Sequence, residues 1–300
     1  MLNGVITPMV TLFNENNKID YEANKYLVNY LIDSKVDGIL IFGSIGEFFS
    51  ISLKEKKKYL SYIIDLVDNR VPILVGTGGN IIEEVIDLSQ FSASQKADAI
   101  VLLMPYFFDL DQKSIYNYYT SVAENIDLPI YIYNFPARTG VNLEIDTIAK
   151  LIKSNKKFVG LKDSVTTLDH TRKLINKIKA LEPEFDIFSG FDEHLIPNLL
   201  VGGNGIIGGL SNIVPKLFVS TLAAYKNQEW DKLEIYNKKI SILMEIYDVT
   251  NPFIKAIKEA VAINNNDILA SCKFPMSDCT RSEKNEIEKT IARAEISDFI

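Results

Sequence analysis

Eight short apolar runs, rich in β-branched residues, recur along the first two-thirds of the chain. They are Gly4–Thr7, Gly38–Phe42, Pro72–Val75, Ala99–Leu103, Pro129–Tyr133, Phe158–Leu161, Phe185–Ser189 and Gly205–Ile207. Their starting positions lie 20 to 34 residues apart, which leaves room for one helix and two short loops in each interval. The runs are nearly all apolar, as expected for parallel strands that are covered on both faces. They predict an α/β protein built from eight strand-helix units.

Eight such units suggest a closed (β/α)8 barrel, the TIM barrel architecture. A doubly wound open sheet remains an alternative, because strand count alone does not establish closure. The segments between the runs carry apolar residues at helical spacing, as in Tyr21–Lys35. Ser52 and Glu55 have the spacing of a capping box, which predicts that a helix begins there.

The strand pattern stops after Pro215, and residues 216–300 predict three or four amphipathic helices, including Trp230–Tyr247 and Pro252–Ile263. No linker rich in Gly, Pro or Ser separates this region from the rest. We therefore expect a barrel with the active site over residues 1–225. Residues 226–300 would form a helical appendage packed on it, rather than a second catalytic domain.

Charge and composition exclude several classes of partner. The 39 acidic and 32 basic residues give a net charge of −7, so the electrostatic footprint of a nucleic-acid-binding protein is missing. The first lysine is Lys18, so the amino terminus lacks the basic region of a secretory signal. The longest uncharged stretch, Leu195–Pro215, contains five glycines and predicts a buried strand with glycine turns rather than a membrane span. A cytoplasmic protein that acts on small molecules is expected.

Metal and nucleotide cofactors are not predicted. Cys272 and Cys279 provide neither a disulfide framework nor a zinc-ligand spacing. His170 and His194 are the only histidines in the sequence, and we expect them at surface or helix-capping positions. Neither a Walker sequence nor a G-x-G-x-x-G motif follows any predicted strand.

Two side chains at neighbouring strand ends are candidates for chemistry, because barrel active sites lie at the carboxyl ends of the strands. Lys162 follows the run Phe158–Leu161, and desolvation there would favour the neutral amine that attacks a carbonyl. Tyr133 ends the preceding strand, so its phenol could carry protons close to Lys162. The alternatives are a lysine that reaches solvent and a half-buried interface tyrosine.

Two further features could bind an anion. The turn Gly43–Glu47 joins a strand to a helical segment, and its backbone N–H groups could form a nest for a carboxylate or a phosphate, although glycine turns are common. Arg138 lies just beyond the fifth strand. Its guanidinium could pair with a substrate carboxylate or equally with an acidic side chain of the protein.

Four motifs occur in the order and spacing of the pyruvate-dependent class I aldolases, and the chain resembles that family over nearly its whole length. They are Gly43-Ser44-Ile45-Gly46-Glu47, Tyr133-Asn134-Phe135-Pro136 with Thr139-Gly140, Gly160-Leu161-Lys162-Asp163-Ser164, and Gly190-Phe191-Asp192-Glu193. The family includes dihydrodipicolinate synthase, N-acetylneuraminate lyase and the 2-keto-3-deoxy sugar acid aldolases. The resemblance implies a (β/α)8 barrel, a homotetramer formed as a dimer of dimers, and no metal or organic cofactor.

The resemblance also implies roles for individual residues. Lys162 would form a Schiff base with the keto carbon of pyruvate or another 2-keto acid. Tyr133 would be the proton shuttle, assisted by the Ser44 hydroxyl, and the backbone N–H groups of Ser44 and Ile45 would bind the carboxylate. Ile207 aligns with the residue whose backbone faces bound pyruvate. The protonated imine would serve as the electron sink.

Departures from the family pattern bear on the choice among its members. Dihydrodipicolinate synthases carry two threonines where this chain has Ser44 and Ile45, and a second tyrosine after Tyr106 where it has Phe107, which cannot carry a proton. Lys162-Asp163-Ser164 is more similar to the sugar acid aldolases. In contrast, Arg138 matches the synthase arginine that binds the carboxylate of aspartate semialdehyde.

We therefore predict a carbon-carbon lyase that reversibly cleaves a 2-keto-3-deoxy sugar acid, such as 2-keto-3-deoxygluconate, to pyruvate and an aldehyde. The predicted substrate-binding residues, besides the pyruvate site, are Tyr106, Arg138, Ser164, Asp192 and Glu193. The alternatives are a dihydrodipicolinate synthase, an N-acetylneuraminate lyase, and a pyruvate-binding sensor that has lost turnover.

Overall fold

Eight parallel strands follow one another in chain order as a closed barrel. They are β1 (Gly4–Pro8), β2 (Gly38–Ile41), β3 (Ile73–Gly76), β4 (Ala99–Leu103), β5 (Ile130–Asn134), β6 (Phe158–Asp163), β7 (Asp186–Ser189) and β8 (Gly205–Ile206). This computed structural model describes residues 2–265 and 268–300. The predicted (β/α)8 fold class is confirmed, and the open-sheet alternative is wrong.

Strand positions agree with the apolar runs to within two residues at each end. The largest difference is in β6, which continues through Lys162 to Asp163 instead of ending at Leu161. Lys162 is therefore held in the strand ladder rather than in the loop that follows.

The uncharged segment Leu195–Pro215 differs from its prediction. It begins with a helix, α8 (Leu195–Leu200), and its strand β8 is limited to Gly205–Ile206. A segment without charged residues offers no contrast between an exposed and a buried face, so its helical part could not be distinguished from a strand by periodicity.

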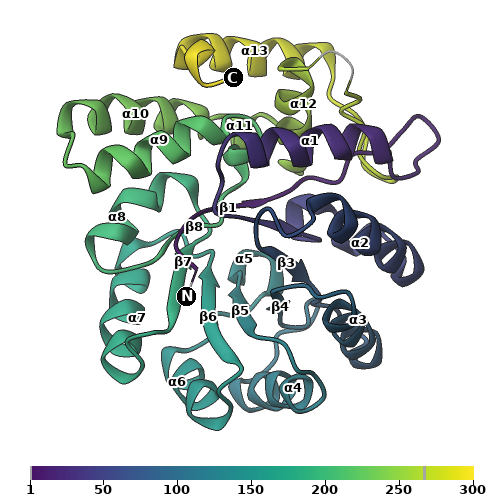
Figure 1. The fold of residues 1–300 in the computed structure, drawn as a ribbon, viewed down its shortest axis with the longest axis vertical. Coiled ribbons are helices and arrows are strands. Elements are labelled where there is room, and N and C mark those ends of the chain that lie inside the picture. The colour runs from purple at the N-terminus through teal and green to yellow at the C-terminus, as the bar shows by residue number, and fades with distance from the viewer. Residues whose placement is uncertain (1, 266–267) are drawn as a thin grey trace. The chain divides into compact units, whose positions relative to one another are not determined.

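The chain divides into two compact units. One consists of Ile51–Ile207 with the residues before Gly4, and it contains strands β3 to β8. Figure 1 shows α3, α4 and α6 on the outer side of these strands. The helices of this unit are α2 (Leu53–Val67), α3 (Ile82–Ser94), α4 (Gln112–Glu124), α5 (Pro136–Thr139), α6 (Ile145–Ser154), α7 (Leu168–Leu181) and α8.

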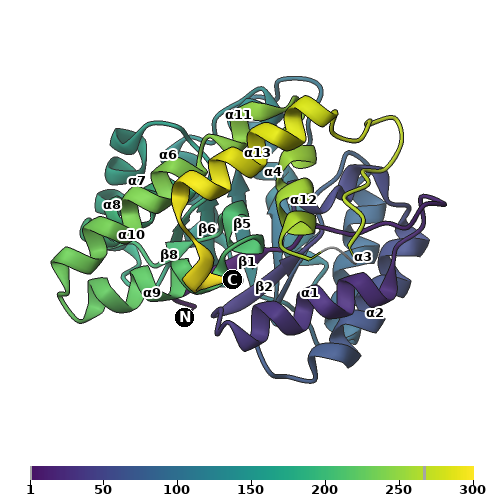
Figure 2. The same ribbon diagram turned by 90° about the horizontal axis from the view of Figure 1, so that it is seen from above.

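The other unit combines Gly4–Ser50 with Gly208–Ile300. It contains β1, β2, α1 (Tyr21–Asp33), α9 (Pro215–Lys226), α10 (Trp230–Leu243), α11 (Ile246–Val249), α12 (Ile254–Ile263) and α13 (Arg281–Ala294). Within it α13 packs along α10 and α12, as Figure 2 shows. The predicted helix Trp230–Tyr247 is interrupted after Leu243. The predicted domain boundary after residue 225 stays a prediction.

No helix in residues 2–265 and 268–300 has the length and apolar character needed to cross a membrane.

The capping box at the start of α2 is formed as predicted. The Ser52 hydroxyl oxygen accepts a hydrogen bond from the backbone N–H of Glu55 at 3.3 Å, and the Glu55 carboxylate accepts one from the backbone N–H of Ser52 at 3.4 Å.

We expect Ser52→Ala to lower the free energy of unfolding by about 1 kcal/mol, measured by urea denaturation. The control is Ser94→Ala at the exposed end of α3, where the change should stay within about 0.5 kcal/mol. Equal losses in the two variants would contradict the capping role.

Candidate active site

Lys162 and Tyr133 lie directly opposite each other on β6 and β5. The Lys162 Nζ atom is 4.5 Å from the centroid of the Tyr133 ring. Lys162 is 5% exposed and Tyr133 is 4% exposed, so both side chains are buried within the unit that holds β3 to β8. The ring of Phe135 stacks on that of Tyr133 with 5.8 Å between centroids. A buried amine beside a phenol is the arrangement needed for imine chemistry with proton transfer.

Ser164 and the segment Gly190–Glu193 also lie together. The backbone N–H of Ser164 donates to Asn134 O at 2.8 Å, and that of Gly190 donates to Asp163 O at 2.8 Å. A Cβ atom on Gly190 would lie 1.9 Å from the Ser164 hydroxyl oxygen, so a side chain at 190 would displace Ser164. Asp192 is buried and Glu193 is exposed.

Three other predicted residues occupy different parts of the same unit. Ile207 directly follows β8, is fully buried, and its backbone N–H donates to Ser189 O at 2.8 Å. Arg138 lies on the short helix α5 with its guanidinium carbon 5.7 Å from the Phe135 ring centroid. Tyr106 follows β4, and partial burial raises the pKa of its phenol. The neighbouring Phe107 has a φ of +100° and is 84% exposed.

Ser44 and Ile45 belong to the other unit, where they form a 3-10 turn, η1 (Ser44–Gly46), directly after β2. The backbone N–H of Gly46 donates to Gly43 O at 3.0 Å, and the Thr11 hydroxyl donates to Gly46 O at 2.8 Å. Ile45 is buried near Gly209: a Cβ atom at 209 would lie 3.3 Å from its Cδ1 atom and 2.5 Å from the Tyr247 hydroxyl. The turn is thus hydrogen-bonded and packed within its own unit.

The sequence predicts no role for Glu47, although this residue belongs to the motif Gly43–Glu47. Its carboxylate is fully buried and forms an ion pair with Lys258 of α12, which is also fully buried. A second Glu47 oxygen accepts a hydrogen bond from the backbone N–H of Lys273 at 2.8 Å. Lys258 Nζ also donates to Ser271 O at 2.8 Å. These bonds tie the residue after η1 to the segment that precedes α13.

The expectation that both histidines lie at surface or helix-capping positions is wrong in part. His194 is 7% exposed, and burial lowers its pKa. It occupies the N-cap position of α8, in agreement with the expectation, but its side chain forms no capping hydrogen bond. The His170 Nδ1 atom lies 3.0 Å from the buried Asp163 carboxylate, and this hydrogen bond raises the pKa of the imidazole. Among the described residues, no three His, Cys, Asp or Glu side chains form a group suited to a metal.

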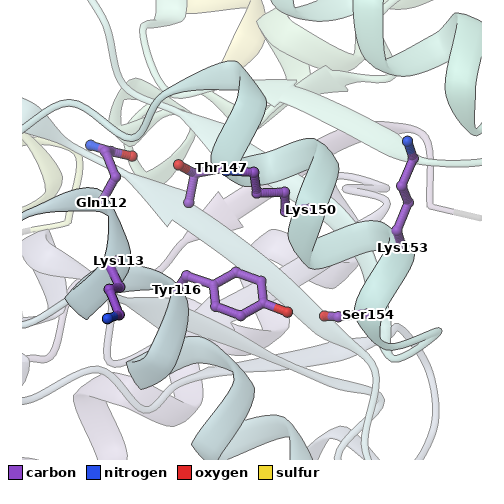
Figure 3. Close-up of a pocket in the computed structure, with 7 residues that line it drawn as sticks. All are labelled: Gln112, Lys113, Tyr116, Thr147, Lys150, Lys153 and Ser154. Atoms are coloured by element: carbon purple, nitrogen blue, oxygen red, sulfur yellow. The ribbon is translucent and has the colours of Figure 1, made fainter.

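An open cavity of about 600 Å³ lies between α4 and α6 on the outside of the same unit (Figure 3). It is lined by Gln112, Lys113, Tyr116, Thr147, Lys150, Lys153 and Ser154. None of these is a predicted site residue, so the cavity is separate from the constellation around Lys162.

Comparison with known proteins places this geometry in a family. The chain is 31% identical over 296 residues to YagE of Escherichia coli K12, whose provisional name is 2-dehydro-3-deoxy-D-gluconate aldolase, covering 99% of this chain and 98% of YagE. It is 30% identical to YjhH of Escherichia coli K12, provisionally a 2-dehydro-3-deoxy-D-pentonate aldolase, with 95% of each chain covered. A 4-hydroxy-tetrahydrodipicolinate synthase from Methanococcus aeolicus is 32% identical, covering 98% of this chain and 99% of the synthase.

The crystal structure of YagE in complex with pyruvate superimposes with a TM-score of 0.95 at 32% identity, covering 98% of both chains. The model of the dihydrodipicolinate synthetase family matches residues 1–294. The chain therefore belongs to the dihydrodipicolinate synthetase family of pyruvate-dependent lyases and is itself a lyase.

Proposed function

We propose that the protein is a class I aldolase that reversibly cleaves a 2-keto-3-deoxy sugar acid to pyruvate and an aldehyde through a Schiff base on Lys162. The observation that carries the proposal is the buried Lys162 amine, 4.5 Å from the ring centroid of Tyr133 on the adjacent strand. The names of YagE and YjhH support the sugar acid as the substrate class. The pyruvate bound in the YagE crystal structure supports the keto acid half of it.

The proposed cleavage needs only the Lys162 amine, the Tyr133 and Ser44 hydroxyls, and water. The Lys162 amine attacks the C2 carbonyl carbon of the substrate, and water leaves as the imine forms. The C3–C4 bond then breaks: its electrons move toward the protonated imine nitrogen, the C4 hydroxyl loses its proton, and the aldehyde departs. The resulting enamine takes a proton at C3, and hydrolysis of the imine releases pyruvate and the free amine. In this proposal the Tyr133 phenol carries the protons, assisted by the Ser44 hydroxyl.

The other predicted residues take substrate-binding roles in the proposal. The backbone N–H groups of Ser44 and Ile45 bind the carboxylate of the keto acid, and the backbone of Ile207 faces the bound pyruvate. The remaining side chains contact the sugar hydroxyls or a distal carboxylate: Tyr106, Arg138, Ser164, Asp192 and Glu193. Glu193 and Arg138 are the exposed members of this group, and Ser164 and Asp192 are buried.

Borohydride reduction in the presence of pyruvate tests the Schiff base. Reduction converts the imine to a stable secondary amine, so digestion and mass spectrometry should locate a pyruvate-derived adduct on Lys162. The matched comparison is Lys258, another buried lysine, which should remain unlabelled. No label, or a label at a different lysine, would overturn the mechanism.

Dihydrodipicolinate synthase activity is the second candidate, favoured by the exposed Arg138 and by the 32% identical synthase from Methanococcus aeolicus. A panel of pyruvate with sugar-derived hydroxyaldehydes and with aspartate semialdehyde, followed by NMR, separates the two. A higher kcat/KM for aspartate semialdehyde than for the hydroxyaldehydes would favour the synthase activity over the aldolase activity.

The proposed enzyme is a cytoplasmic homotetramer, and sedimentation of the purified protein tests its oligomeric state.

A further inference from the structure

Behind Lys162 and Tyr133, the next residues on the same two strands face the helices. Asn134 and Asp163 are paired across β5 and β6, one position beyond the Tyr133 and Lys162 pair. Because side chains alternate between the faces of a strand, these two project away from the side that Lys162 and Tyr133 occupy. Both are almost completely buried.

The Asp163 carboxylate is the centre of a hydrogen-bond cluster. Its Oδ1 atom accepts from Asn134 Nδ2 at 2.9 Å, and its Oδ2 atom accepts from Thr171 Oγ1 at 3.1 Å and from His170 Nδ1 at 3.0 Å. The carboxylate is 0% exposed and the His170 side chain is 15% exposed. Burying a carboxylate costs several kcal/mol unless it is paired and hydrogen-bonded, so these donors are needed to keep Asp163 in place.

The contacts continue into a closed ring. Asn134 Nδ2 also donates to Asn142 Oδ1 at 2.9 Å, and Asn142 Nδ2 lies 3.3 Å from His170 Nε2. The Asn134 Oδ1 atom accepts from the backbone N–H of Leu143 at 3.1 Å. The ring Asp163–His170–Asn142–Asn134 therefore joins β5, the segment before α6, β6 and α7. The charged groups near His170 are Asp163 on β6 and Asp169 and Lys173 on α7, while the segment before α6 contributes the uncharged Asn142.

We propose that His170 is a positioning residue for the Schiff-base reaction: through Asp163 and Asn134 it fixes the ends of β5 and β6, and so holds the Lys162 amine against the Tyr133 phenol. This inference rests on the proposed function. A displacement of about 1 Å between reacting groups can cost on the order of 100-fold in rate. Because the hydrogen-bonded ring begins one residue beyond Lys162 and Tyr133, a change in the ring can move these two groups and lower the reaction rate. His170 itself does not touch the reacting atoms.

The test uses exchange of the pyruvate methyl protons into deuterated water, followed by NMR, because this needs no aldehyde. His170→Leu removes both ring nitrogens and should lower kcat by about 10- to 100-fold, with KM for pyruvate changed by less than about threefold. His170→Asn places an amide N–H near the former Nδ1 position and should recover most of the loss. The control Lys177→Gln, at an exposed position of the same helix, should exchange at the wild-type rate.

A second variant guards against loss of folding in His170→Leu. Asn142 is exposed, so Asn142→Ala opens the ring without disturbing the core, and it should also lower kcat while KM stays constant. Wild-type kcat in both Asn142→Ala and a folded His170→Leu would overturn the inference, as would equal losses in His170→Leu and His170→Asn. Borohydride labelling of the wild-type protein separates the two hypotheses: an unlabelled Lys162 overturns the proposed function and this inference with it. A labelled Lys162 with normal rates in the variants overturns the positioning role alone.

Discussion

Replacing Lys162 with Met will abolish pyruvate turnover while leaving the protein at least as stable as the wild type. We expect kcat for methyl-proton exchange and for aldol cleavage to fall by about 10⁴-fold or more, as for removal of a covalent nucleophile in other enzymes. Without the amine no imine forms, so no other group can accept the electrons of the breaking C3–C4 bond. Borohydride with pyruvate should leave the variant unlabelled.

The stability half of this prediction follows from the surroundings of Lys162. The amine is buried against the Tyr133 ring, and in the described part of the chain it forms no ion pair with a carboxylate. Met is of similar length and carries no group that must be desolvated, so the free energy of unfolding should stay the same or rise by about 1 kcal/mol. Urea denaturation measures it. A large loss of stability with activity retained would show that Lys162 is a structural residue.

Lys162 and Tyr133 could be predicted because their positions depend only on where two apolar runs end. Parallel strands in a barrel carry functional side chains at their carboxyl ends, so two adjacent run ends place two side chains together without knowledge of the loops. The β5 and β6 register confirms that juxtaposition.

The Asp163 and His170 pair could not be predicted in the same way. Its geometry depends on β6 continuing to Asp163 and on α7 beginning at Leu168, and apolar runs locate such boundaries poorly. The ion pair of Glu47 and Lys258 is even harder to predict from the sequence, since its members are 211 residues apart and no periodicity connects them. Hydrophobic patterns predict which face of an element is buried. They do not predict which buried polar groups form hydrogen bonds or ion pairs with each other.

The Glu47 and Lys258 pair is the second place where a single substitution should have a large effect. Both side chains are 0% exposed, and Lys258 Nζ also lies 4.3 Å from the Phe13 ring centroid. Burial lowers the pKa of Lys258, although the Glu47 carboxylate opposes this. Removing one partner would leave the other buried without a counter-charge.

We expect Lys258→Met to lower the free energy of unfolding by about 3–5 kcal/mol, measured by urea denaturation. Glu47→Gln, which leaves the ammonium without its partner, should cost a comparable amount. The double variant Glu47→Gln/Lys258→Met should be more stable than Lys258→Met alone, because the buried charge is then absent. Losses that simply add would contradict coupling between the two residues.

The same helix supplies the control. Lys255 of α12 is 8% exposed and lies 3.6 Å from a Glu283 carboxylate that is itself 25% exposed. Since Glu283 can be hydrated when its partner is removed, Lys255→Met should cost no more than about 1 kcal/mol. The difference in free energy of unfolding between the two Lys→Met variants therefore isolates the cost of leaving a fully buried carboxylate unpaired.

Because Glu47 directly follows Ser44–Gly46, Glu47→Gln should also raise KM for pyruvate if that turn binds the keto acid carboxylate, whereas Lys255→Met should leave KM unchanged.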